Sequence, residues 1–126
     1  MILIDTSAWI DFFRDGPLAE AVELSLDAAD SALCGPVYTE VLRGLRRPKE
    51  NAKVRALLAG CHWLEQPDEL WRDAGDLGQS LKAKGANVKT LDLLIATYAL
   101  AHHVPLLSAD ADFRLMKKHG LDLHLL

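Results

Sequence analysis

The sequence has few cysteines and no long apolar run, and each shortage excludes a class of protein. Two cysteines, Cys34 and Cys61, are too few for a disulfide framework, and no ordered histidine pattern accompanies them to form a zinc site. The first apolar run ends at Asp5 and has no basic segment before it, so we expect no export signal. No apolar stretch approaches the roughly 20 residues that a membrane helix needs. These absences predict a protein of the reducing cytoplasm with no membrane segment.

Length and composition indicate one globular domain. The chain has 126 residues, of which 50% are hydrophobic and 25% charged. A chain of this length buries most of its apolar surface without staples. Because it contains no linker, repeat or low-complexity segment, we expect residues 1–126 to form a single domain.

The charge is unevenly distributed, although the net charge is only -4. Residues 43–55 contain a single acid, Glu50, and six basic residues: Arg43, Arg46, Arg47, Lys49, Lys53 and Arg55. Three lysines, Lys82, Lys84 and Lys89, form a second basic stretch. This pattern suits the binding of a polyanion, and it equally suits a solvated helix face.

Apolar strands and helical segments alternate along the chain. We expect strands at 1–5, 32–34, 62–64 and 104–107, with a possible last strand at 121–126. The helical segments between them are expected at 8–13, 18–28, 36–45, 49–58, 69–84 (capped by Asp68), 91–103 and 113–119. Gly85 and Gly120 mark two helix ends. Without a tight hairpin signal, this order predicts an α/β fold in which helices cover both faces of a parallel sheet.

Four acids follow or face the ends of these strands. Asp5 follows the first strand, Glu40 lies on the helix after the second, Asp92 starts a helix, and Asp110 follows the fourth strand. The carboxyl edge of a parallel sheet is where ligands bind, and carboxylates gathered there repel one another unless a cation neutralises them. Oxygen ligands without Cys or His favour Mg²⁺ or Mn²⁺ over zinc.

Each acid also has a plain structural interpretation. Asp5 and Asp110 suit helix caps, Asp92 suits a first helical turn, and Glu40 suits an exposed polar position. These interpretations explain the acids singly and leave their common edge unexplained.

Four short segments together resemble a known family. Residues 3–9 (LIDTSAW), 40–44 (EVLRG), 92–96 (DLLIA) and 107–113 (LSADADF) are similar, in the same order, to PIN-domain ribonucleases. The similarity is strongest to the VapC-like toxins of prokaryotic toxin-antitoxin pairs, and it covers nearly the whole chain.

The resemblance implies a PIN-like three-layer α/β/α fold with four or five parallel strands and a metal-dependent endoribonuclease. It assigns catalysis and Mg²⁺ or Mn²⁺ binding to Asp5, Glu40, Asp92 and Asp110. Asp112 is then an additional ligand through water. Ser7 and Ser108 are outer hydrogen-bonding groups, and Arg43, Arg46 and Lys89 are expected to contact RNA phosphates.

The resemblance also implies two protein partners. One is a second copy of the chain in a homodimer. The other is a cognate VapB-like antitoxin that inserts a segment into the active-site groove and keeps the toxin inactive.

Other functions fit the residues less well. A phosphoaspartate phosphatase needs a second Asp two residues after the first, where this chain has Ser7. A histidine ribonuclease needs two convergent imidazoles, and the five histidines are scattered. A non-catalytic RNA-binding or regulator-binding PIN-like module would have lost an acid, and all four are present. Trp9, Trp63 and Trp71 could stack on bases, but their positions are more typical of core or interface residues.

Overall fold

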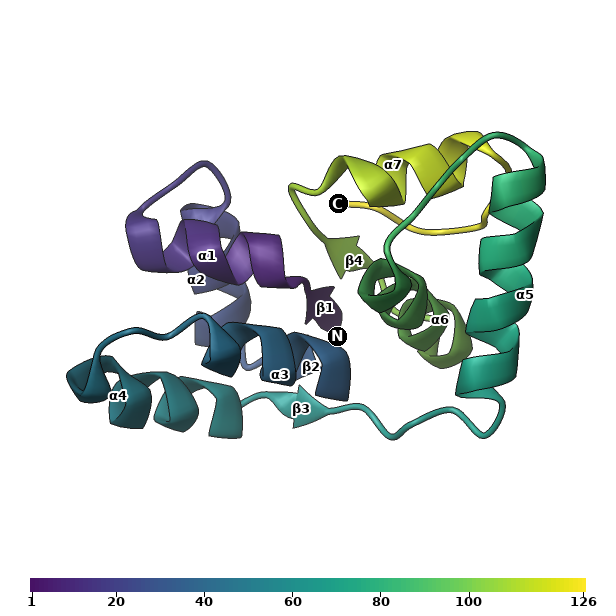
Figure 1. Ribbon diagram of the computed structural model, residues 1–126. Helices are drawn as coiled ribbons and strands as arrows, with labels where there is room; N and C mark the ends of the chain where they lie inside the picture. The colour runs from purple at the N-terminus through teal and green to yellow at the C-terminus, as the bar shows by residue number, and fades with distance from the viewer.

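A short parallel sheet forms the centre of the protein (Figure 1). The computed structural model describes residues 1–126, and its four strands are ordered β3-β2-β1-β4. Their bounds are β1 Ile2–Ile4, β2 Ser31–Leu33, β3 His62–Trp63 and β4 Leu106–Leu107. All pairs are parallel, with Leu3 of β1 opposite Ala32 of β2 and Leu106 of β4.

Seven helices flank this sheet (Figure 1). They are α1 Thr6–Arg14, α2 Ala19–Asp27, α3 Gly35–Arg43, α4 Pro48–Ala59, α5 Leu70–Ala83, α6 Thr90–His102 and α7 Ala111–Lys118. Helix α1 packs beside α2 and α3, and α6 packs beside α3, α5 and α7. The predicted α/β fold with a parallel sheet and helices on both faces is confirmed.

Burial explains why these segments take these positions. Leu3 and Ile4 of β1 are fully buried, as expected of a strand covered on both faces. Residues 92–99 of α6 are buried on every side of the helix, so α6 is an internal helix rather than an amphipathic surface one. Trp9 of α1 and Phe113 of α7 are also fully buried, and each large apolar side chain of this kind contributes roughly 1.5–3 kcal/mol. The core therefore holds α1, α6 and α7 firmly against the sheet.

The C-terminal segment differs from the expected fifth strand. Residues 121–126 form only an isolated parallel bridge between Leu125 and Leu106. The backbone N–H of Leu123 donates to the carbonyl of Leu121, so the segment turns where a strand would run straight. The sheet thus has four strands, the lower of the two predicted numbers.

The start of α5 also differs from the prediction. Asp68 is not its cap: the N-cap is Glu69, without a side-chain capping bond, and the Leu70 N–H donates to the Pro67 carbonyl in a preceding turn. At the other end, Gly85 has φ of +84°, the left-handed conformation that glycine adopts without a steric penalty. Gly120 ends α7 in the same way, with φ of +98°.

The three tryptophans divide into one core residue and two exposed residues. Trp9 is in the core, but Trp63 and Trp71 are 57% and 65% exposed, so these two are not core residues and the alternative, an interface position, stays a prediction. Trp63 lies on the edge strand β3 and contacts the Tyr38 ring edge-on at 5.6 Å between ring centroids. None of the seven helices is long and apolar enough to cross a bilayer.

Candidate metal centre

Three carboxylates meet at the edge of the sheet beyond β4. One oxygen each of Asp92, Asp110 and Asp112 lies within 4.8 Å of the others. Asp92 comes from the first turn of α6, whereas Asp110 caps α7 and Asp112 lies in the first turn of that helix. The Asp112 N–H donates to Asp110 Oδ1 at 2.9 Å, which fixes the α7 pair relative to each other. We call these three residues the acidic cluster.

Asp92 is the buried member of the acidic cluster. Its side chain is 7% exposed, and its Oδ2 atom is buried without a hydrogen-bond partner. Burial is the largest of the effects that together raise the pKa of Asp92 to about 8; the Asp112 side chain and the charges of Asp110 and Asp5 also raise it, and Lys89 lowers it. A buried carboxylate without a donor is costly unless a cation approaches it.

Lys89 is the cation that approaches the acidic cluster. Its Nζ atom lies 3.6 Å from Asp110 Oδ2 and 3.9 Å from Asp92 Oδ2. These two carboxylates raise the pKa of the Lys89 ammonium, Asp110 more than Asp92. In this structure Lys89 contacts the acids, and its expected contact with RNA phosphate stays a prediction.

Asp5 lies outside the acidic cluster and is held by two serines. It caps α1 and is 2% exposed, and its Oδ2 accepts hydrogen bonds from Ser108 Oγ at 2.7 Å and Ser7 Oγ at 2.8 Å. Ser108 Oγ accepts in turn from the N–H of Asp110, and Ser7 Oγ accepts from the N–H of Ala109, both at 2.9 Å. The two hydroxyls therefore connect Asp5 to the loop that carries Asp110. Asp5 does not belong to the tight group of three.

Glu40 approaches the site from α3, and a threonine holds it. Its Oε1 accepts from Thr6 Oγ1 at 2.8 Å. Thr6 directly follows Asp5, so the same turn positions two acids from different elements. The contact between Thr6 and Glu40 was not anticipated from the sequence. The signal that could have indicated this contact is a hydroxyl side chain directly after an acid at the end of a strand. Cys34, the N-cap of α3, is close enough that Asp5 and Glu40 add to the burial that raises its thiol pKa to about 12.

Three helix N-termini point at this edge of the sheet. Asp5 and Asp110 are true N-caps, each accepting from a backbone N–H in the first turn of its helix, and Asp92 lies in the first turn of α6. The capping interpretation of Asp5 and Asp110 is thus correct, and it does not compete with their common location. The positive ends of the helix dipoles offset part of the repulsion among the carboxylates.

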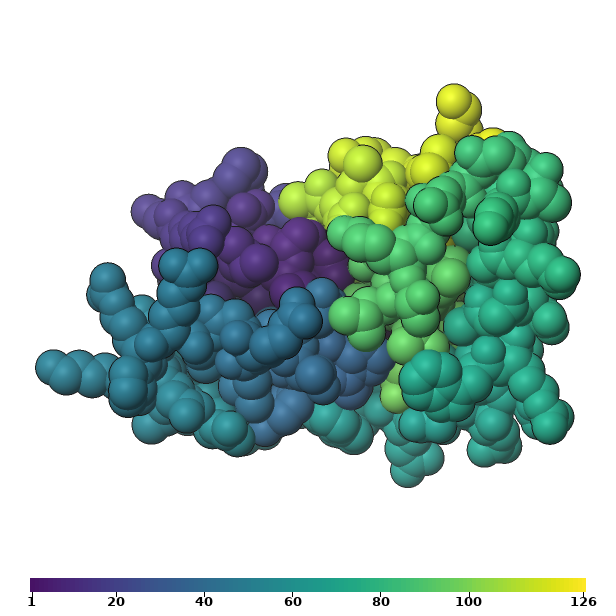
Figure 2. Space-filling view, viewed as in Figure 1, coloured from purple at the N-terminus to yellow at the C-terminus, as the bar shows by residue number.

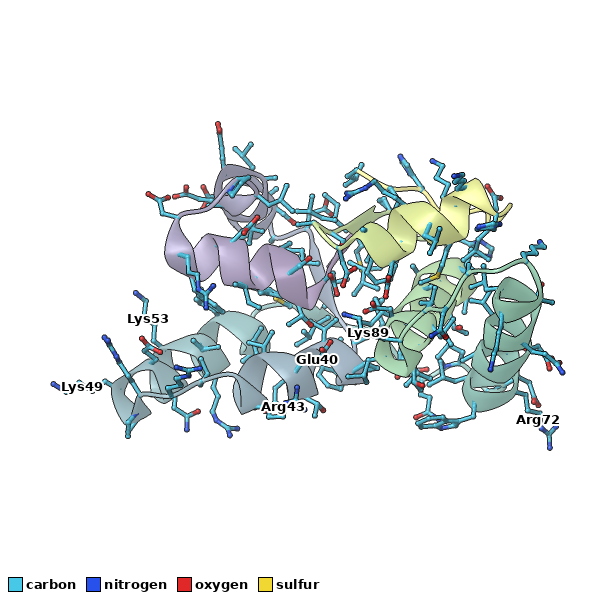
Figure 3. The ribbon with its side chains drawn as sticks, turned by 45° about the horizontal axis from the view of Figure 1, so that its top comes forward. Glu40, Arg43, Lys49, Lys53, Arg72 and Lys89 are labelled. Atoms are coloured by element: carbon cyan, nitrogen blue, oxygen red, sulfur yellow. The ribbon has the colours of Figure 1, made fainter.

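The basic segment lies apart from the acidic cluster. All six basic residues from Arg43 to Arg55 are exposed, and none forms an ion pair. In Figure 3, Glu40 and Lys89 lie toward the middle of the molecule, whereas Lys49 and Lys53 lie at its far end. The space-filling view shows the α4 side chains projecting from that end (Figure 2). Arg43, one helical turn after Glu40, is the basic residue of α3 that leads from the site toward this segment.

The residues of the site fit a divalent cation. The donors are all carboxylate oxygens, the set that Mg²⁺ and Mn²⁺ prefer. The buried Oδ2 of Asp92 provides a separate indication, because it lacks the hydrogen-bond donor that such an atom requires.

The fold and this site together define a class: a three-layer α/β protein with an acidic, oxygen-only centre at the carboxyl edge of a parallel sheet. Comparison with known proteins gives the family. Residues 2–119 match the PIN domain, and the chain belongs to the PIN-domain family.

Named relatives share this assignment. The chain is 35% identical over 119 residues to ribonuclease VapC11 of Mycobacterium tuberculosis and to a VapC ribonuclease of Mycobacterium bovis, covering 90% of this chain and 89% of each relative. Among solved structures, it resembles VapBC2 of Rickettsia felis bound to a promoter DNA fragment, with a TM-score of 0.78 at 22% identity over 100% of this chain and 98% of that one. DNA-bound VapBC of Salmonella typhimurium gives 0.79 at 17% identity over 99% and 96%. The predicted family resemblance is confirmed.

Proposed function

We propose that this protein is an endoribonuclease that hydrolyses RNA phosphodiester bonds with Mg²⁺ or Mn²⁺, and that it acts as the toxin of a toxin-antitoxin pair. The observation that carries the metal chemistry is the acidic cluster with its buried, unpartnered Asp92 oxygen. The ribonuclease activity is proposed from the VapC relatives, which are 35% identical over 90% of the chain.

In this proposal Asp5, Asp92 and Asp110 hold the ion. Asp112 approaches it directly or through water, since its carboxylate lies within the acidic cluster. Glu40, held by Thr6, binds a second ion or orients the attacking water. Ser7 and Ser108 position Asp5 without binding the ion, because their hydroxyls donate hydrogen bonds to Asp5 Oδ2.

A bound Mg²⁺ or Mn²⁺ supplies the electrophilic chemistry by polarising the phosphoryl oxygen and lowering the pKa of the attacking water. The protein supplies a rigid arrangement of acids. Two of them are helix caps and a third is buried in α6, so their carboxylates do not have to be ordered when RNA binds.

RNA is positioned by the exposed cations. Arg43 and Arg46 form no ion pair with protein acids, so their side chains are free for phosphate oxygens. Phosphate contacts of this kind set the register of a nucleic acid without reading its sequence. Lys89 is the cation nearest the acids and is the third proposed phosphate contact.

The proposed partners are a VapB-like antitoxin and a second copy of the chain. Several similar structures are VapBC complexes, which supports the antitoxin. Apolar side chains remain exposed on α1 and α2, namely Ile10 and Phe13 at 40% and Leu24 at 62%, and a protein partner would cover such a surface.

The test is RNA cleavage by purified, antitoxin-free protein. We expect single-stranded RNA to be cut with Mg²⁺ or Mn²⁺ and to remain intact with EDTA. Asp110→Asn keeps an oxygen for the α7 cap and removes the charge, so it should be inactive, whereas Asp122→Asn, at an exposed acid outside the site, should cleave at the wild-type rate. Cleavage that persists in EDTA would exclude the metal mechanism and favour a histidine ribonuclease.

A further inference from the structure

Lys89 occupies an unusual position for a surface lysine. It is the N-cap residue of α6, and its side chain is 73% exposed, yet its ammonium reaches both Asp92 and Asp110. It is the only side-chain cation that forms an ion pair with these acids. The buried Asp92 Oδ2, which has no hydrogen-bond partner, has this ammonium 3.9 Å away as its nearest counter-charge.

We propose that Lys89 is an exchangeable internal counter-ion, which neutralises the acidic cluster in the metal-free protein and moves away when a divalent ion binds. The inference rests on the proposed function, because it assumes that the acidic cluster is a metal site. It assigns Lys89 a role in metal binding as well as a contact to RNA.

The geometry supports competition between the ammonium and the ion. Both need the Oδ2 atoms of Asp92 and Asp110, and Lys89 lies close to both at once. An ammonium and a divalent ion on the same oxygens would repel each other at about 4 Å, and this repulsion persists even at the dielectric of water. One of the two therefore has to leave.

Lys89 is able to leave. Exposed ion pairs are weak, and the lysine side chain is a flexible four-carbon stem with a strongly hydrated head. No hydrogen bond fixes its Nζ elsewhere in the structure. When displaced, the ammonium remains at the rim of the site, where the phosphate of a bound RNA would be its next available anion.

The consequence is a negative coupling between Lys89 and the metal. Removing the ammonium eliminates a competitor, so a neutral residue at position 89 should strengthen metal binding. A lysine that merely orders the site would have the opposite effect, because its removal would let the carboxylates move apart.

The experiment is a calorimetric Mn²⁺ titration of the full-length protein, with Lys89→Met, Lys89→Arg and Lys53→Met as variants. We expect Lys89→Met to lower the Mn²⁺ dissociation constant about two- to tenfold, the range set by the energy of one or two exposed ion pairs. Lys89→Arg keeps the charge and should bind like wild type. Lys53→Met removes an equivalent exposed charge far from the site and should also bind like wild type (Figure 3).

A second readout does not depend on calorimetry. The rise in melting temperature on adding Mn²⁺ should be larger for Lys89→Met than for wild type, because the ion no longer displaces a bound cation. Equal or weaker Mn²⁺ binding by Lys89→Met would overturn the inference and leave the metal site intact. If the wild type and all variants fail to bind Mn²⁺, the proposed metal chemistry is wrong and the inference fails with it.

Discussion

The substitution Asp92→Asn distinguishes the effect of the buried charge on stability from its role in metal binding. The substitution nearly preserves the shape of the side chain and removes the charge from the oxygen that has no partner. Because the pKa of Asp92 is raised in the folded protein from 3.8 to about 8, the fold favours the protonated form. The ionised form is therefore destabilising in metal-free protein. This penalty is absent below pH 3.8, grows as the pH rises, and is complete above about pH 8.

The magnitude follows from the width of that window. At pH 7 the penalty has an upper limit of about 4 kcal/mol, from roughly three pH units at about 1.4 kcal/mol each. For a chain of 126 residues, 1 kcal/mol corresponds to about 4 °C in melting temperature. If only a quarter of the limit is realised, Asp92→Asn melts about 4 °C above wild type in EDTA at pH 7, and the difference falls by more than half at pH 5.

Metal should reverse the order. An ion that binds only the folded state stabilises it by RT ln(1 + [L]/Kd), about 1.4 kcal/mol at a tenfold excess over Kd, and Asp92→Asn has lost a ligand. The assay is a set of thermal melts of both proteins at pH 5 and 7, with EDTA and with excess Mg²⁺. The reasoning is refuted if Asp92→Asn is less stable than wild type in EDTA and gains as much from Mg²⁺, since Asp92 would then be only a helix-start residue.

Three further outcomes test other parts of the structure. Arg46→Ala should weaken RNA binding and flatten its salt dependence by about one counterion, measured as the slope of log Kd against log salt; an unchanged slope would make Arg46 a solvated surface residue. Gly78→Ala should lower the free energy of unfolding by about 1 kcal/mol, because a Cβ there would lie 2.8 Å from Leu93 Cδ1 between α5 and α6; a urea midpoint at or above wild type would contradict this. Cys34 and Cys61 should react slowly with iodoacetamide at pH 8, because burial raises their pKa values to about 12 and about 11 and keeps the thiols protonated. Mass spectrometry of native and urea-unfolded protein would check this, and rapid native alkylation would show an accessible thiolate.

The parts of the fold with continuous apolar runs could be predicted. The apolar run before Asp5 and the long apolar segment of α6 are too hydrophobic for any position other than the core, and both are buried there. The C-terminal segment was predicted wrongly, because residues 121–125 alternate apolar and polar side chains as a strand does, but the neighbouring strand β4 has only two residues and pairs with it through a single bridge. The exposure of Trp63 and Trp71 was also unpredictable, since aromatic residues on an edge strand or a surface helix are indistinguishable by spacing from buried ones.

The acidic edge was predictable, and its internal geometry was not. Parallel strands place their carboxyl ends together, so the approach of acids from β1, α6 and the β4–α7 loop follows from topology. Which acids come within 4.8 Å depends on loop conformation, and here the group contains Asp112 rather than Asp5. Sequence spacing does place Lys89 three residues before Asp92, the distance at which side chains on a helix start can meet. This spacing could have indicated the contact of Lys89 with Asp92.

The hydrogen bonds of Ser7 and Ser108 determine how late during translation the acidic site can form. Asp5 and Ser7 hydrogen-bond to Ser108, more than 100 positions away in the chain. A ribosome adds roughly 5–20 residues per second, so the first acid waits several seconds for the groups that orient it. Until the loop after β4 has left the ribosome, the nascent chain contains Asp5 but not Asp110 and Asp112. The messenger that encodes this protein is thus read to at least codon 112 before the complete acidic site can form.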